Sequence, residues 1–247
     1  MQRWRLDLEY DGAPFAGWQI QPGAPTIQQA LEDAVLGLFG EHARVCASGR
    51  TDAGVHAEHQ VATFVSAVER SERAVRDGLN AGLPAAIVVT RATRVPPEFD
   101  PRRQVKTKTY RYQWLDREVR SPFLAGRAWH QRRRLDVAAM HAAVQALDGT
   151  HDFEAFRAQG CQADHAVRTI GPLRVEREGD LVCLRVQGHG FLRHMIRIVA
   201  GTITEVGQGR REPGWVAEVL ASRDRTRAGR TAPPHGLTLE AVSYPDE

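Results

Sequence analysis

The pattern of hydrophobic and polar positions changes its period along the chain. Over residues 3–10, apolar side chains recur at every second position, which predicts a strand. Residues 11–25 are rich in Gly and Pro and predict a loop. From Thr26 onward the apolar positions follow helical spacing, and Thr26 with Gln29 three positions later has the form of a capping box.

The same reasoning gives the remaining elements. Further strands are predicted at residues 44–48, 60–66, 86–95, 105–115, 167–177, 181–187 and 237–244. Further helices are predicted at residues 71–82, 136–149, 191–206 and 214–221, with Gly149 and Gly207 as helix stops. Because the order of these elements is not a strict βαβα alternation, we predict an α+β fold with mainly antiparallel sheet.

Both parts of the chain mix strands and helices in a similar way. We therefore expect two similarly built α+β halves, residues 1–115 and 116–247, around a mainly antiparallel sheet with a central active-site cleft. The first half carries a loop with Asp52 and a strand with Tyr110, and the second half completes the cleft. The 247 residues are enough for one large domain or two modest ones.

Composition points to a globular protein of the cytoplasm. Hydrophobic residues make up 42% of the chain and charged residues 26%, which is ordinary for a soluble domain. The N-terminus has the pattern of a strand and not of a signal peptide, and no apolar run is long enough to cross a bilayer. The three cysteines, Cys46, Cys161 and Cys183, are widely spaced and odd in number, which argues against a disulfide framework and fits a reducing compartment.

The basic residues are mostly arginines. Of 33 basic residues, only Lys106 and Lys108 are lysines, while the net charge is +3. Arginine suits bidentate phosphate contacts and stacking on bases, although a GC-rich genome would produce the same bias. Clustering is more informative, and the clusters favour a polyanionic partner. They contain Arg102, Arg103, Lys106, Lys108 and Arg111, then Arg132, Arg133 and Arg134, then Arg223, Arg225, Arg227 and Arg230.

The sequence lacks the motifs that are typical of several common kinds of active site. His56 with His59, His189 with His194, and Cys161 with His165 have no second ligand pair at zinc-site spacing, so no metal site is predicted. No GxxxxGK[ST] or GxGxxG motif follows a strand, and GxSxG is absent, so neither a nucleotide cradle nor a serine hydrolase is indicated. A glycosidase would require two neighbouring carboxylates, whereas the stretch around Asp52 offers one.

The stretch SGRTDAGVHA, residues 48–57, places Asp52 near Arg50 on a loop between two predicted strands. One interpretation is structural: Thr51 or Asp52 caps backbone N–H groups, and Gly54 supplies a positive φ. The other interpretation is functional. A single carboxylate, strand aromatics such as Tyr110 and many arginines suit chemistry on a nucleobase that has been taken out of its stack.

Six ordered segments carry a resemblance to a known family. They are YDGAPFAGWQIQPGAPTIQQALEDAV, SGRTDAGVHAEHQVATF, FDPRRQVKTKTYRY, THDFEAFRA, GFLRHMIRIVAGTITEVGQGR and APPHGLTLEAVSYP, and they span nearly the whole chain. With these segments the chain resembles the tRNA pseudouridine synthase A family, whose members convert uridines at positions 38 to 40 of the tRNA anticodon stem-loop. The resemblance implies an isomerase with the pseudouridine synthase fold.

The resemblance also implies roles for five residues. Asp52 is the expected catalytic residue, and Tyr110 is expected to stack on the target base. Arg50 matches an arginine implicated in flipping the nucleotide. Arg197 matches an arginine that pairs with the catalytic carboxylate, and Leu237 matches an apolar wall.

The implied reaction breaks the C1′–N1 bond of uridine and joins C5 to C1′. Nothing is oxidised or hydrolysed, so no cofactor is expected. Asp52 would attack the sugar, attack the ring or remove a sugar proton, and the sequence leaves these routes open. Arg197 and Arg50 would offset the desolvation that raises the pKa of a buried carboxylate. The resemblance further implies a homodimer that grips tRNA.

Two alternatives remain open at this stage. A catalytically silent RNA-binding module or RNA chaperone would use the same arginines and aromatics. A metal-dependent RNA hydrolase is a third class, for which sensitivity to chelators would be diagnostic.

Overall fold

The computed structural model describes residues 1–245, in which the chain forms ten strands and five α-helices. Two compact units are present: Met1–Lys106 together with residues 239–245, and Thr107–Thr238. The division therefore falls after Lys106, where the sequence led us to expect it after residue 115, and the last strand returns mainly to the first unit. Both units contain helices and mostly antiparallel strands, which confirms the α+β fold class.

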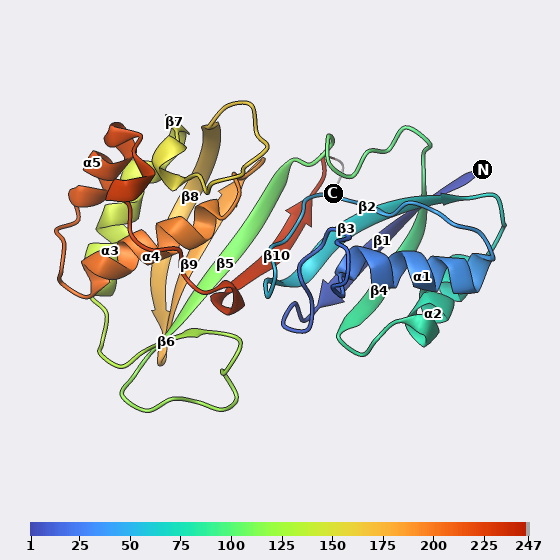
Figure 1. Ribbon diagram of the computed structural model, residues 1–247, viewed down its shortest axis with the longest axis horizontal. Coiled ribbons are helices and arrows are strands. Elements are labelled where there is room, and N and C mark those ends of the chain that lie inside the picture. The colour runs from blue at the N-terminus through green and yellow to red at the C-terminus, as the bar shows by residue number, and fades with distance from the viewer. Residues whose placement is uncertain (246–247) are drawn as a thin grey trace. The chain divides into compact units, whose positions relative to one another are not determined.

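The first unit has two helices and most of five strands (Figure 1). The elements are β1 (Gln2–Tyr10), α1 (Ile27–Phe39), β2 (Cys46–Ala47), β3 (His56–Ser66), α2 (Glu72–Gly82), β4 (Ile87–Val95) and β10 (Leu237–Ser243). The strand order is β4-β1-β3-β10, with β2 also beside β3. Helices α1 and α2 contact each other, and α2 packs along β4. The apolar face of β1 predicted from the alternation is buried, as Trp4, Leu6 and Leu8 show.

Helix α1 starts and stops at the predicted kinds of residue. The Thr26 side chain accepts a hydrogen bond from the backbone N–H of Gln29 at 3.3 Å, so Thr26 is the N-cap. The Gln29 side chain donates to Asp33 at 2.7 Å, and thus points along the helix and away from the cap. Only one half of the predicted capping box is therefore visible. The helix ends at Gly40, which takes the left-handed conformation with a φ of 70°.

The second unit has a separate set of strands and three α-helices. The elements are β5 (Thr107–Asp116), β6 (Trp129–Gln131), α3 (Val137–Val144), β7 (Gly149–Asp152), β8 (Val167–Glu178), β9 (Leu181–Gly188), α4 (Met195–Gly207) and α5 (Trp215–Ser222). Four short 3₁₀ helices are η1 (Gln145–Leu147), η2 (Glu154–Phe156), η3 (Arg225–Arg227) and η4 (Pro234–Gly236). The strand order is β5-β9-β8-β7, and β6 pairs parallel with β5. Helix α3 packs against β8 and against α4 and α5.

Two elements of this unit differ from the sequence prediction. The helix expected at 136–149 ends at Val144 and continues as the 3₁₀ helix η1, after which Gly149, with a φ of 102°, begins strand β7. The helix expected from Phe191 begins only at Met195, because His194 takes the left-handed conformation with a φ of 59°. The short strands β6 and β7 were not predicted, since three or four residues carry too little alternation to be recognised.

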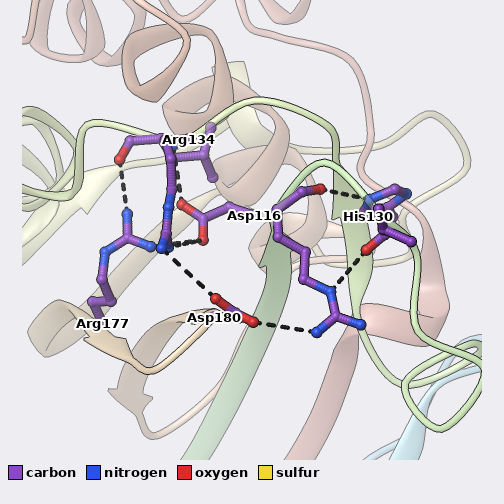
Figure 2. Close-up of polar contacts among 8 residues, drawn as sticks. Asp116, His130, Arg134, Arg177 and Asp180 are labelled. Atoms are coloured by element: carbon purple, nitrogen blue, oxygen red, sulfur yellow. Dashed lines mark hydrogen bonds and ion pairs between the residues drawn. The ribbon is translucent and has the colours of Figure 1, made fainter.

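A buried carboxylate ties the end of β5 to its neighbours (Figure 2). The Asp116 side chain is fully buried and accepts hydrogen bonds from Arg177 at 2.6 Å, from Arg134 at 3.2 Å and from the backbone N–H of Leu135 at 3.0 Å. Arg177 also donates to the Leu135 carbonyl at 3.0 Å. Asp180, in the turn between β8 and β9, pairs with Arg134 at 3.7 Å. Asp116 thus fixes residues 134–135 against β5 and β8.

The same contacts keep Asp116 ionised. Burial alone would raise the pKa of this carboxyl, but the hydrogen bonds from Arg177 and Leu135 and the charges of Arg177 and Arg134 outweigh it, so the pKa lies below its usual value. A lowered pKa in the folded state contributes stability that is present above the unfolded-state pKa and is lost as the pH falls through the folded-state pKa.

We therefore expect Asp116→Asn to lower the free energy of unfolding at pH 7 by about 1–3 kcal/mol, because buried donors lose a charged acceptor. The difference from the parent should shrink once the pH falls below about 4, where the unfolded-state carboxyl titrates. Urea denaturation at pH 7 and at pH 3 measures both. Asp180→Asn, at a half-exposed carboxylate, is the control and should cost less than about 1 kcal/mol. Equal losses in the two variants would contradict the role assigned to Asp116.

Candidate active site

Asp52 lies on the loop between β2 and β3. The strand predicted at 44–48 is reduced to the two residues of β2, and β3 begins at His56, so the loop comprises residues 48–55. Asp52 is half-buried, whereas Arg50 is exposed. The structure therefore places both residues in the first unit, with the carboxylate partly shielded from solvent.

The turn that carries Asp52 contains the predicted glycine conformation. Gly54 has a φ of 75°, and the backbone N–H of Val55 donates to the Asp52 carbonyl at 3.1 Å. The Thr51 hydroxyl is hydrogen bonded to the hydroxyl of Tyr10 at 2.8 Å. The structural interpretation is thus correct for Gly54, and Thr51 acts through a side-chain partner in the core.

The loop predicted at residues 11–25 packs its backbone against the Asp52 loop. The N–H of Trp18 donates to the Thr51 carbonyl at 3.0 Å. Gly17 has a φ of 98°, and a Cβ atom there would lie 2.8 Å from the Thr51 carbonyl oxygen. Gly12 approaches the Val55 carbonyl even more closely, so that a Cβ would overlap it. Only glycine allows these approaches, which explains why this stretch is glycine-rich.

Tyr110 lies on β5 in the second unit. It is 8% exposed and stands opposite Val186 of β9. Its ring meets Phe191 edge to face, with centroids 5.3 Å apart and an interplanar angle of 86°. A Cβ at Gly188 would lie 3.0 Å from the Phe191 ring, so this glycine leaves room for the ring. Phe191 was not predicted as a site residue, although its segment GFLRH was among those that carry the family resemblance.

Arg197 projects from α4 and is held by the segment that precedes Pro233. Its Nε donates to the Ala232 carbonyl at 2.9 Å, and the N–H of Ala232 donates to the Arg197 carbonyl at 3.0 Å. This segment lies close to the helix because Gly201 and Gly229 have no Cβ: one at Gly229 would lie 2.7 Å from the Cα of Thr202. The backbone carbonyl of Ala232 therefore orients the half-buried Arg197 guanidinium through its Nε atom.

Leu237 is the first residue of β10 and is 5% exposed. It follows η4, which rests on Tyr112 of β5: the Tyr112 hydroxyl donates to the Pro233 carbonyl at 2.9 Å, and Gly236 lies against the ring. Burial raises the pKa of Tyr112, although the positive charge of Arg197 acts in the opposite direction. The Tyr112 hydroxyl therefore remains a donor, and Leu237 has a fixed position in the second unit.

Comparison with known proteins gives a consistent result. A family model described as tRNA pseudouridine synthase matches residues 8–102 and 143–245. A tRNA pseudouridine synthase A from Myxococcus xanthus is 51% identical over 247 residues, covering 100% of this chain and 93% of the relative. Proteins of the same name from Methylobacterium sp. (strain 4-46) and Pelobacter propionicus are 48% and 45% identical, over 100% and 99% of this chain and 99% and 100% of their own length.

The chain belongs to the tRNA pseudouridine synthase family. It is therefore an isomerase that converts uridine to pseudouridine in tRNA, as the six segments implied, and a catalytically silent RNA-binding module is not favoured. The matched ranges include Arg50, Asp52, Arg197 and Leu237, while Tyr110 lies between them.

His56 and His59, which form a pair in the sequence, each lie beside a carboxylate. His56 is buried and lies 3.0 Å from Asp11, and His59 lies 3.0 Å from Asp7. Within residues 1–245, His, Cys, Asp and Glu side chains form no group of three or more that could hold a metal ion. Over the same residues, no helix is both long and apolar enough to span a membrane.

Most of the clustered arginines are exposed in the folded enzyme, and some of them also contact other side chains. Arg102, Arg132 and Arg133 are exposed. Several others have protein partners that give them a structural role: Arg134 binds Asp116, Arg223 binds Asp152 at 3.2 Å, and Arg230 lies over the Trp129 ring at 4.5 Å. Lys108 is buried. Burial therefore removes Lys108 from contact with a polyanion, whereas Arg134, Arg223 and Arg230 keep exposed side chains.

Proposed function

We propose that this enzyme isomerises uridines 38, 39 and 40 in the anticodon stem-loop of tRNA, with Asp52 as its catalytic residue. The observation that carries the proposal is the Asp52 loop, whose backbone is fixed on both sides by buried groups while Asp52 itself is only half-buried. A turn residue has no need of such a frame. A carboxylate that must meet one atom of a bound nucleotide does need it.

The chemistry requires one ionised carboxylate and no added reagent. The C1′–N1 bond breaks, the base turns while it is held, and C1′ bonds to C5, which loses its proton while N1 gains one. Asp52 serves as nucleophile or as base in this sequence. Because substrate and product are isomers, no oxidant, reductant or water is consumed.

We assign the remaining expected site residues to substrate binding. Tyr110 offers an aromatic face for the uracil, and its edge contact with Phe191 fixes the plane of the ring. Exposed Arg50 assists extrusion of the nucleotide, and Arg197 contacts its polar groups. Leu237 contributes an apolar surface.

The charge of Asp52 is expected to be essential. Asp52→Asn preserves the shape of the side chain but removes the nucleophile or base, so the variant should fold, bind tRNA and release no tritium from C5-labelled uridine in tRNA. Glu58→Gln is the matched control, since it removes an exposed carboxylate of β3 and should leave turnover intact. A folded, tRNA-binding Asp52→Asn enzyme that still releases tritium would deny Asp52 its catalytic role. Release from a transcript that has cytidine at positions 38 to 40 would refute the proposed positions.

The aromatic face of Tyr110 is expected to matter more than its hydroxyl. Tyr110→Phe should retain most of the activity. Tyr110→Leu keeps an apolar side chain of moderate size but loses the π-face, and since stacking is worth roughly 1–3 kcal/mol per base, kcat/KM should fall about 5- to 150-fold. Steady-state kinetics with thermal melting as a folding control measures this. Equal activity of a folded Leu variant would assign Tyr110 to the core alone.

We further propose that the enzyme is a homodimer in the cytoplasm. The family resemblance supports this, and so does the loop after β5, where Phe123 is 92% and Val119 is 68% exposed, because a second copy would cover these apolar side chains. Sedimentation equilibrium should give twice the 27.4 kDa mass of one chain. A single-chain mass at micromolar protein would contradict the dimer.

A further inference from the structure

A buried carboxamide lies behind the Asp52 loop in the first unit. Gln60 of β3 is fully buried, at 0% exposure. Its Oε1 accepts from the Ser48 hydroxyl at 2.6 Å and from the N–H of Val61 at 3.2 Å. Its Nε2 donates to the Gly49 carbonyl at 2.9 Å and to the Tyr10 hydroxyl oxygen at 3.4 Å. Both ends of the side chain are therefore used, and two of the four bonds go to residues at the start of the loop.

Tyr10 extends this network to the residue before Asp52. The Tyr10 side chain is 4% exposed, and its hydroxyl is 2.8 Å from the Thr51 hydroxyl. Because Gln60 Nε2 can only donate, the Tyr10 oxygen accepts from it, while in the bond between Tyr10 and Thr51 either hydroxyl can be the donor. Burial raises the pKa of Tyr10 to about 12, so the hydroxyl keeps its proton at neutral pH.

The network leaves the backbone around Asp52 with few alternatives. Gln60 fixes Ser48 and Gly49 on one side. On the other side Thr51 is fixed twice, by Tyr10 through its side chain and by the N–H of Trp18 through its carbonyl at 3.0 Å. Burying so many polar groups costs free energy unless every bond is made, and apolar side chains would fill the same space without that cost. What the polar network adds is a defined orientation.

We propose that Gln60 and Tyr10 are positioning residues that set the direction of the Asp52 carboxylate by holding Gly49 and Thr51. This inference rests on the catalytic role proposed for Asp52. A displacement of about 1 Å in a reacting group is enough to lower a rate roughly 100-fold, so the loss of either residue acts on turnover. Substrate affinity, which other side chains supply, stays the same.

The test compares two buried tyrosine hydroxyls of the first unit. Tyr10→Phe removes only the bond to Thr51 and the weak bond to Gln60. Tyr244→Phe removes a bond of similar burial, from the Tyr244 hydroxyl to the Pro101 carbonyl at 2.7 Å, which holds no part of the Asp52 loop. We expect Tyr10→Phe to lower kcat, and the rate constant measured in a single turnover, at least about tenfold with an unchanged Kd for tRNA. Tyr244→Phe should lower the melting temperature by a similar amount and keep the parent kcat.

Gln60→Met gives a second, independent variant of similar volume without hydrogen bonds. It should also lower kcat and leave Kd unchanged, and the Tyr10→Phe/Gln60→Met double variant should lose less than the product of the two single losses, because both residues act on one loop. If Tyr10→Phe keeps the parent kcat, or if Tyr244→Phe loses as much as Tyr10→Phe, the positioning role is overturned. Asp52→Asn, assayed in parallel, distinguishes the catalytic role of Asp52 from the positioning role of Tyr10 and Gln60. If Asp52→Asn is inactive while Tyr10→Phe is fully active, the proposed function is retained and only the positioning role is refuted.

Discussion

The backbone polar groups of the Asp52 loop need hydrogen-bond partners inside the protein, and this constraint shapes the first unit. The backbone of residues 48–55 belongs to neither flanking strand over most of its length. Gln60 and the N–H of Trp18 bind backbone carbonyls of the loop, and Tyr10 binds the Thr51 side chain, so three different segments of the chain hold it. Glycines 12 and 17 are required because the partner backbone approaches too closely for a side chain.

The second unit supports its expected site residues in a different way. There the residues assigned to substrate binding lie on regular elements, Tyr110 on β5 and Arg197 on α4, and need less support from loops. The segment that aligns Arg197 is itself held against α4 by the Ala232 backbone and by glycines that permit close contact. At the other end of β5, Asp116 secures the sheet through charged hydrogen bonds. Asp116 is thus the last residue of β5, whereas Tyr110, for which we propose a role in binding, lies in the first half of the same strand.

Much of the fold was predictable from local pattern. The strands at β1, β4, β5, β8 and β9 and the helices α1, α2 and α5 lie within a few residues of their predicted limits, because period and capping residues are local signals. The errors occur where tertiary contacts override those signals. The helix after Asp136 stops early, and α4 starts late at the left-handed His194. The unit boundary differed as well, since the first half of the prediction included β5, which packs with β9.

The sequence by itself determined the α+β class, the family and the identity of the expected site residues, because ordered motifs and alternating hydrophobicity can be recognised in the sequence alone. Only the tertiary structure decided which polar residues support that site. Gln60 lies eight residues after Asp52, and Tyr10 lies forty-two residues before it. Neither spacing predicts a contact with the Asp52 loop. The hydrogen bonds of these two residues exist because β1 and β3 pair, with Leu8 opposite Gln60 and a shift of register before Tyr10, which brings both side chains to the Asp52 loop. A contact set by strand register is a property of the sheet, and no local pattern encodes it.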